Sequence, residues 1–108
     1  GDRSPADAVH DLLRLRGRGT TALEAALRRS ARQLARSRAK RRLTILLSDC
    51  RATAGVDPIA AARRLDELCI IAPADDAEDA VEFARRVGAR IATVDGPSAI
   101  PTALASVL

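Results

Sequence analysis

The run Leu43–Ser48, followed by Asp49, constrains the fold of this chain more than any other segment. Its first five positions are apolar or β-branched, which predicts a strand that is buried on both faces. Strands of this kind belong to parallel sheets that helices cover. Ligands of open parallel sheets bind beyond the carboxyl ends of the strands. The segment therefore predicts an α/β fold and makes Asp49 a candidate site residue.

Two further strands are predicted downstream, at Cys69–Ala72 and Arg90–Val94. Apolar residues at helical spacing predict helices over residues 22–38, from residue 57 to residue 68, over residues 76–87 and over residues 98–108. Gly88 closes the third of these helices, at the position where a left-handed cap forms most easily. Strands that alternate with helices pair in parallel through right-handed crossovers. We expect a three-layer, Rossmann-like sheet with helices on both faces.

The N-terminal segment is predicted to be a helix. Ser4–Asp7 matches a capping box with proline at the first helical position, and Val9, Leu12 and Leu13 follow at helical spacing. Only three strands then remain, which places Leu43–Ser48 at an unprotected edge of the sheet. We therefore expect self-association through this edge, or dependence on a further strand.

The two cysteines, Cys50 and Cys69, are expected to be free. Cys50 follows one predicted strand and Cys69 begins the next, so parallel pairing separates them by roughly 20 Å along the strand direction. A disulfide needs Cα atoms within about 7 Å of each other. Two free thiols favour a reducing, cytoplasmic setting. The sequence also contains no apolar run long enough to span a bilayer.

Positive charge is concentrated in the first part of the chain. Residues 1–42 carry a net charge of +8 and residues 43–108 a net charge of −4, within a total of +4. The excess lies in Arg28, Arg29, Arg32, Arg36, Arg38, Lys40, Arg41 and Arg42. Such a run binds an acidic protein or phosphate backbones, or is simply a solvated helix face. No aromatic residue among these positions is available to stack on bases, which disfavours nucleic acid.

Acidic residues follow each predicted strand. Asp49, Asp75, Asp76 and Asp95 would gather at the carboxyl edge of a parallel sheet. Carboxylates at such an edge repel phosphate and suit a hard cation. Helix capping is the alternative role for Asp75 and Asp76, and a turn role is the alternative for Asp95.

Two segments together resemble the von Willebrand factor A family. Gly19–Leu27 places two hydroxyls at the start of a helix and resembles the loop and helix that carry the metal-ligating threonine of that family. Leu43–Arg51 is similar to the family's fourth strand, whose terminal aspartate belongs to the metal-ion-dependent adhesion site. The downstream order of helices and strands also fits, so the resemblance covers nearly all of residues 4–108.

The resemblance implies that Thr21 and Asp49 are metal ligands. Thr21 is preferred to Thr20 because Leu23 follows it by two positions, as in the family. The family's Asp-x-Ser-x-Ser motif is absent, so residues 1–108 are interpreted as the C-terminal half to two-thirds of a single domain. We expect the intact domain to hold Mg²⁺ or Mn²⁺, and this chain alone to bind neither tightly.

Two features of the sequence argue against the implied metal site, one at Thr21 and one next to Asp49. Thr21–Glu24 also satisfies the capping-box pattern, so the hydroxyl of Thr21 has a plain structural role available to it. Cys50 replaces the glycine that commonly follows the family's aspartate. A larger side chain at that position is expected to crowd the mouth of the site.

The implied function is a metal-ion-dependent protein-binding module, not an enzyme. Bacterial domains of this family are often paired with AAA+ ATPases or occur in chelatase-type assemblies, and Arg32, Arg36 and Arg38 are the candidate partner-binding residues. A nucleic-acid-binding domain and a phosphoacceptor or enzyme on a flavodoxin-like sheet are the alternatives. A phosphoacceptor needs a lysine after its last strands, whereas the only lysine, Lys40, precedes all three predicted strands.

Overall fold

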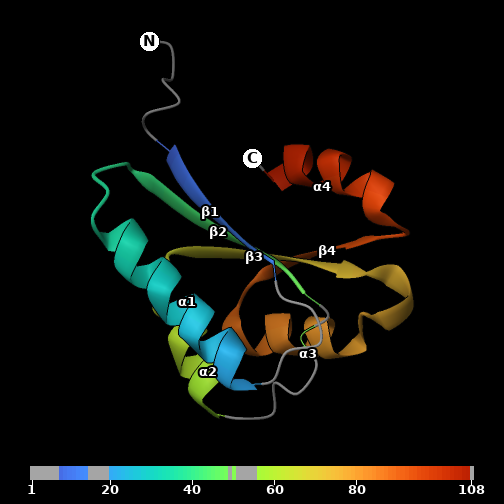
Figure 1. The fold of residues 1–108 in the computed structure, drawn as a ribbon, viewed down its shortest axis with the longest axis horizontal. Helices are drawn as coiled ribbons and strands as arrows, with labels where there is room; N and C mark the ends of the chain where they lie inside the picture. Colours follow the sequence, from blue (N-terminus) through green and yellow to red (C-terminus); the bar gives the residue numbers. More distant parts are fainter. Residues whose placement is uncertain (1–7, 15–19, 49, 51–55, 108) are drawn as a thin grey trace.

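A computed structural model describes residues 8–14, 20–48, 50 and 56–107 of the chain. Its four strands are β1 (Ala8–Arg14), β2 (Arg41–Leu47), β3 (Glu67–Pro73) and β4 (Arg90–Val94). Its helices are α1 (Thr20–Ala35), α2 (Val56–Ala62), α3 (Glu78–Val87) and α4 (Ile100–Val107), with short 3₁₀ turns η2 (Ala74–Asp76) and η3 (Pro97–Ala99). All strands are parallel, in the order β1-β2-β3-β4 (Figure 1). The expected α/β fold is confirmed.

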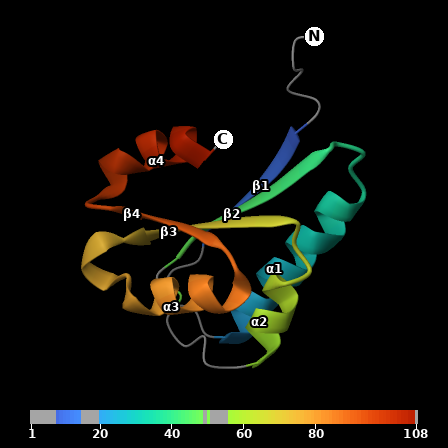
Figure 2. The ribbon, with the colours of Figure 1, turned by 180° about the vertical axis from the view of Figure 1, so that it is seen from behind.

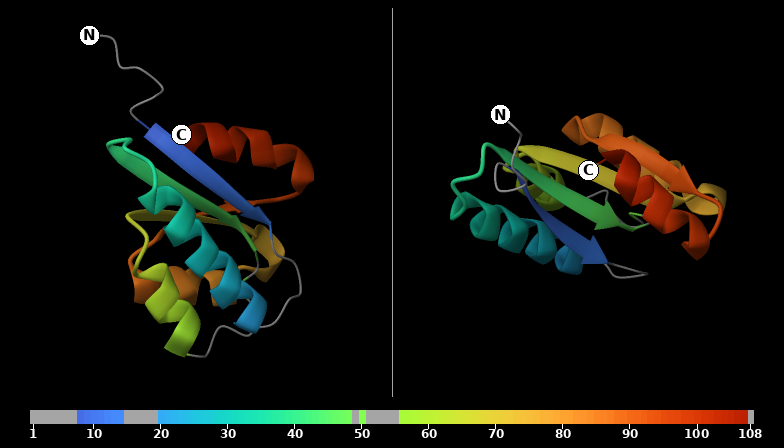
Figure 3. Two further views of the ribbon diagram at one scale, coloured as in Figure 1. Left: turned by 60° about the vertical axis from the view of Figure 1, so that its left-hand side comes forward. Right: turned by 90° about the horizontal axis from the view of Figure 1, so that it is seen from above.

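The helices cover the two faces of the sheet unequally. Because the strands follow one another in chain order and crossovers are right-handed, the connecting helices α1, α2 and α3 lie on the same face (Figure 2). The terminal helix α4 packs alone on the other face, against β3 and β4 (Figure 3). None of the helices in the described ranges is long and apolar enough to cross a membrane.

The strand β2 lies inside the sheet, which corrects the expectation that it forms an unprotected edge. It pairs with β1 on one side, where Leu13 lies opposite Leu46, and with β3 on the other, where Leu46 lies opposite Ile70. The sheet thus has four strands instead of three. Self-association through the edge of β2 is excluded because both of its edges already carry a partner strand.

The prediction of a helix at the N-terminus is wrong for the residues that the structure describes, because Ala8–Arg14 forms the strand β1. In a strand, neighbouring side chains point to opposite faces. Leu13 accordingly enters the core with 5% exposure, whereas Leu12 on the other face is 41% exposed. The three residues Val9, Leu12 and Leu13 are too few to distinguish the spacing of a helix from that of a strand. Pairing with the apolar edge of β2 decides the outcome.

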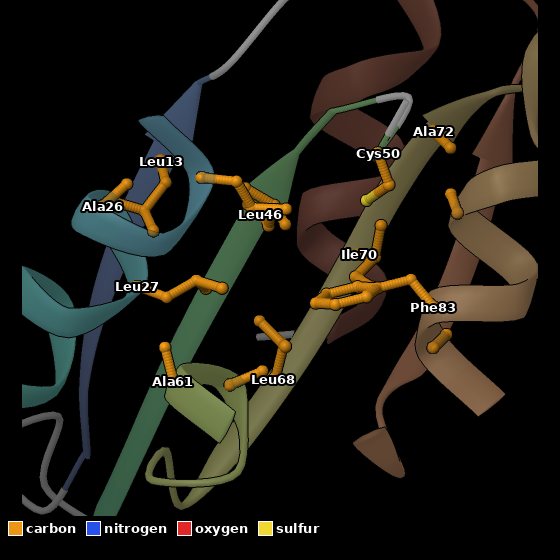
Figure 4. Packing of buried hydrophobic residues seen from close by; sticks show 14 residues of the cluster. Leu13, Ala26, Leu27, Leu46, Cys50, Ala61, Leu68, Ile70, Ala72 and Phe83 are labelled. Carbon is orange, nitrogen blue, oxygen red and sulfur yellow. The ribbon is translucent and has the colours of Figure 1, made fainter. Parts of the chain in front are cut away.

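The main core lies between the sheet and the three connecting helices. Leu27 of α1, Leu46 of β2, Ile70 of β3 and Phe83 of α3 are all buried in it (Figure 4). A smaller cluster fills the opposite face, where Leu43, Ile45, Cys69 and Ile71 pack with residues of α4. The alternation of β2 between the two clusters explains why Leu43, Ile45, Leu46 and Leu47 are all apolar.

The helices α2 and α3 begin or end at residues that the sequence pattern did not identify. The helix α2 ends at Ala62, because Leu68 belongs to β3 instead of continuing the helical stripe. The N-cap position of helix α3 is Ala77, so neither Asp75 nor Asp76 occupies that position. Its C-terminus agrees with expectation. Gly88 is left-handed, with φ 73°, and its N–H donates to the Ala84 carbonyl.

Alanine substitutions at adjacent residues of β1 distinguish a strand from a helix. Leu13→Ala should lower the free energy of unfolding by roughly 2–4 kcal/mol, because it opens a cavity in the main core. Leu12→Ala should cost less than about 1 kcal/mol, since that side chain is largely solvated. Urea unfolding of both variants measures the difference. Equal losses would show that the alternation of β1 is misassigned.

Candidate functional site

The carboxyl edge of the sheet is the first candidate region. Thr21 is the second residue of α1, which follows β1 and runs back across the sheet. The side chain of Thr21 and the whole of Asp49 lie outside the described residues. Their neighbours are described: Ser48 and Cys50 follow the last residue of β2, and the Ser48 N–H donates to the Ile71 carbonyl over 3.1 Å.

The turn after β2 has an unusual backbone conformation. The N–H of Cys50 donates to Ser48 Oγ over 2.9 Å, and Cys50 adopts φ 56°, in the left-handed region that favours glycine. This conformation gives a physical reason for the glycine that the resemblance leads us to expect here. The Cys50 side chain is only 1% exposed and points into the main core beside Ile70 (Figure 4). It therefore packs inward, not at the mouth of the edge.

The acidic residues after β3 and β4 lie at the expected positions in the fold. Asp75 and Asp76 form η2 directly after β3, and Asp95 follows the last residue of β4. Asp75 and Asp95 are exposed. In the described ranges, no three side chains of histidine, cysteine, aspartate or glutamate come together as a metal site. These three acids therefore share an edge without forming a metal centre by themselves.

The second candidate region is a basic surface, defined as Arg29, Arg32, Arg36, Arg38 and Lys40. Arg29, Arg32 and Arg36 are spaced three and four residues apart, so the first two lie on one face of α1 and the third continues that line just past its end. Arg38 and Lys40 follow in the connection to β2. All five residues are exposed, while the opposite face of α1 buries Leu23, Leu27 and Leu34.

The cations of the basic surface lack carboxylate partners, whereas several other arginines of the described chain have them. Elsewhere, Arg28 pairs with Glu24, Arg41 and Arg90 with Glu67, Arg42 with Asp66, and Arg85 and Arg86 with Glu82. Across the described part of the chain, none of the five residues of the basic surface makes an ion pair or a side-chain hydrogen bond. This surface therefore keeps its charge available for a partner.

The amino edge of the sheet carries an ion-pair cluster that the sequence analysis missed. Glu67 begins β3 and contacts Arg41 of β2 at 3.0 Å and Arg90 of β4 at 3.6 Å. Hydrogen bonding to Glu67 raises the pKa of Arg41, so the arginine stays charged. The signal was present in the sequence, since oppositely charged residues open three successive strands. That these residues pair with one another could be recognised only once the order of the strands in the sheet was known.

The thiols offer little chemistry. Both cysteines are free and buried, as expected, with Cys50 in the main core and Cys69 under α4. Burial raises the pKa of the Cys69 thiol, and the nearby charge of Arg90 opposes this shift only in part. A thiol of this kind remains protonated near neutral pH and is a poor nucleophile.

Replacement of Cys50 tests the conformation of the turn. In a helix, glycine is less stabilising than alanine. At a left-handed φ the order is reversed, because the Cβ of alanine clashes with the backbone there and glycine has no Cβ. We expect Cys50→Gly to be at least as stable as Cys50→Ala, and by up to about 1 kcal/mol more stable. Thermal and urea unfolding of the two variants provide the measurement. A clearly less stable glycine variant would contradict the assigned backbone conformation.

Comparison with known proteins adds no assignment. No family model, curated protein or solved structure matches this chain. The resemblance to the von Willebrand factor A family thus stays an interpretation of Gly19–Leu27 and Leu43–Arg51.

Proposed function

We propose that this domain is a protein-binding module whose basic surface docks onto an acidic surface of a partner protein. The observation that carries the proposal is the set of five exposed cations without carboxylate partners on α1 and the connection after it. Clustered positive charge accelerates encounter with an acidic partner and fixes its orientation. Arginine is also enriched in protein interfaces, where its planar group pairs with carboxylates.

Protein is favoured over nucleic acid as the partner. Single-stranded nucleic acids are usually held by aromatic side chains that stack on bases. The only aromatic residue of the sequence, Phe83, is buried in the core on the opposite side of α3 from solvent. A binding role is likewise favoured over catalysis, because Cys50 and Cys69 are buried and neither thiol is paired with the exposed His10 of β1 in the described part of the chain.

The proposal includes a metal ion on the basis of the family resemblance. Thr21 and Asp49 supply a hydroxyl and a carboxylate, which are oxygen ligands of the type that Mg²⁺ and Mn²⁺ take. In the intact domain such an ion would add a second contact to an acidic partner. An AAA+ ATPase or a chelatase-type assembly in the cytoplasm is the partner class that follows from the resemblance.

Charge reversal tests the basic surface. The triple variant Arg32→Glu, Arg36→Glu and Arg38→Glu should weaken binding of a glutamate-rich peptide by roughly tenfold or more and flatten its salt dependence. Fluorescence anisotropy at low and moderate salt, with duplex DNA titrated in parallel, provides the measurement.

A matched control changes three other exposed arginines, Arg63, Arg85 and Arg86, to glutamate. It alters the net charge equally but leaves the basic surface intact, so it should retain most peptide binding. Unchanged peptide affinity in the first variant would refute docking through this surface. Binding of duplex DNA in clear preference to peptide, lost in the same variant, would replace the protein partner with nucleic acid.

Metal binding is tested separately by Mn²⁺ calorimetry. Mg²⁺ and Mn²⁺ take about six ligands, and two from separate segments do not offset the cost of dehydration, so this chain should bind Mn²⁺ weakly or not at all. In the intact domain, Asp49→Ala should reduce binding most. Thr21→Ala should reduce it less, because a neutral hydroxyl is a weaker ligand than a carboxylate. Tight binding by this chain alone would overturn the expectation, and normal binding by intact Asp49→Ala would move the site elsewhere.

A further inference from the structure

A small pocket lies at the C-terminal end of α1, beside the basic surface. Its volume is about 60 Å³, and its wall includes Ala31, Leu34, Ala35, Arg42, Arg64 and Asp66. A water molecule occupies about 30 Å³ in the liquid, so the pocket has room for one small polar group and not for a nucleotide. Ala31 and Ala35 directly precede Arg32 and Arg36 in the sequence, so the pocket adjoins the basic surface.

Arg42 lies in the wall of this pocket, and its guanidinium makes one hydrogen bond in the described part of the chain. Its Nη2 donates to the Ser37 carbonyl over 2.7 Å, and its Nη1 lies 3.8 Å from Asp66 Oδ2, beyond hydrogen-bonding distance. Its Nε–H is shielded from solvent and has no acceptor in the described part of the chain. A buried donor without an acceptor is rare in proteins. The guanidinium is thus held in place by Ser37, and because its Nε–H is closed to a water-sized group, its Nη groups are the donors that remain for a ligand.

The charges around the pocket favour an anion. Arg64 is exposed and makes no side-chain hydrogen bond or ion pair within the described ranges. Asp66 is the one acid in the pocket wall, and its side chain is 57% exposed. Two arginines against one carboxylate leave a net positive charge, which excludes a metal cation. The long Arg42–Asp66 contact is weak enough for a better-placed oxyanion to displace it.

We propose that this pocket binds a single oxyanion group, a carboxylate or a phosphoryl group, through Arg42 and Arg64. The inference rests on the proposed function only for the natural source of that group, which would be an acidic side chain of the docked partner. Arginine suits this role because its planar, always charged guanidinium offers several directed donors to an oxyanion.

The larger pocket at the amino edge, of about 220 Å³, is not a comparable site. It is lined by Arg63, Glu67 and Arg90, among others. Glu67 already pairs with Arg41 and Arg90, and Arg63 donates to the Arg86 carbonyl over 3.1 Å. Its carboxylate Glu67 already offsets the charge of the arginines beside it, so the pocket lacks the excess positive charge found around Arg42 and Arg64.

Titration with small ions tests the pocket directly. Sodium phosphate and sodium acetate are added at constant ionic strength while the amide signals of Ala31, Ala35 and Leu65 are followed by NMR. Saturable shifts confined to these amides are expected. Asp66→Asn should bind about threefold tighter or better, because it removes the competing charge. Arg64→Gln should bind roughly tenfold weaker, because a charged hydrogen bond is lost.

Arg63→Gln is the matched control, since it removes the same charge from the adjacent residue and should leave the affinity unchanged. Absence of saturable shifts, or an Asp66→Asn variant that binds no tighter, would overturn the proposal. Response to both ions supports a general oxyanion site, and response to only one identifies its natural chemistry. The Arg32, Arg36 and Arg38 triple variant should still bind the small ions, so failure of the pocket and failure of the docking surface are distinguishable.

Discussion

The burial of β2 between two partner strands and two hydrophobic clusters is the constraint on which the rest of the structure depends. Leu46 enters the main core, while Leu43 and Ile45 enter the cluster under α4. The one polar residue in the middle of this strand, Thr44, is fully buried and shares a 2.9 Å hydrogen bond with Ser30 of α1. This bond satisfies both hydroxyls and fixes which face of α1 packs on the sheet.

That orientation of α1 determines where the charge of the domain lies. With Ser30 and Leu27 turned to the sheet, Arg29, Arg32 and Arg36 are turned to solvent. The sequential order of the strands places α1, α2 and α3 on one face, so the basic surface ends beside the segment that joins α2 to β3. The pocket around Arg42 and Arg64 forms at that junction. The basic surface and the neighbouring pocket thus both follow from the orientation of α1 on the sheet.

The distribution of acidic residues completes the electrostatic arrangement. Glu67 and Asp66 contact arginines at the starts of the strands, and Glu82 pairs with Arg85 and Arg86 on α3. Exposed ion pairs of this kind add little to stability. Their larger consequence is that they neutralise arginines elsewhere and leave the basic surface as the concentrated positive charge in the described part of the chain. This contrast supports a docking role more directly than net charge does.

The sequence by itself determined the elements whose local pattern is long or chemically unambiguous. The apolar run of β2, the strand Arg90–Val94, the left-handed cap at Gly88 and the basic run on α1 were all identified from spacing and residue type. Only the tertiary structure decided that Ala8–Arg14 is a strand, because three apolar residues fit either period until β2 offers an edge. It likewise decided that Arg41 and Arg90 pair with Glu67, since these residues are distant in sequence and meet only when the strands align.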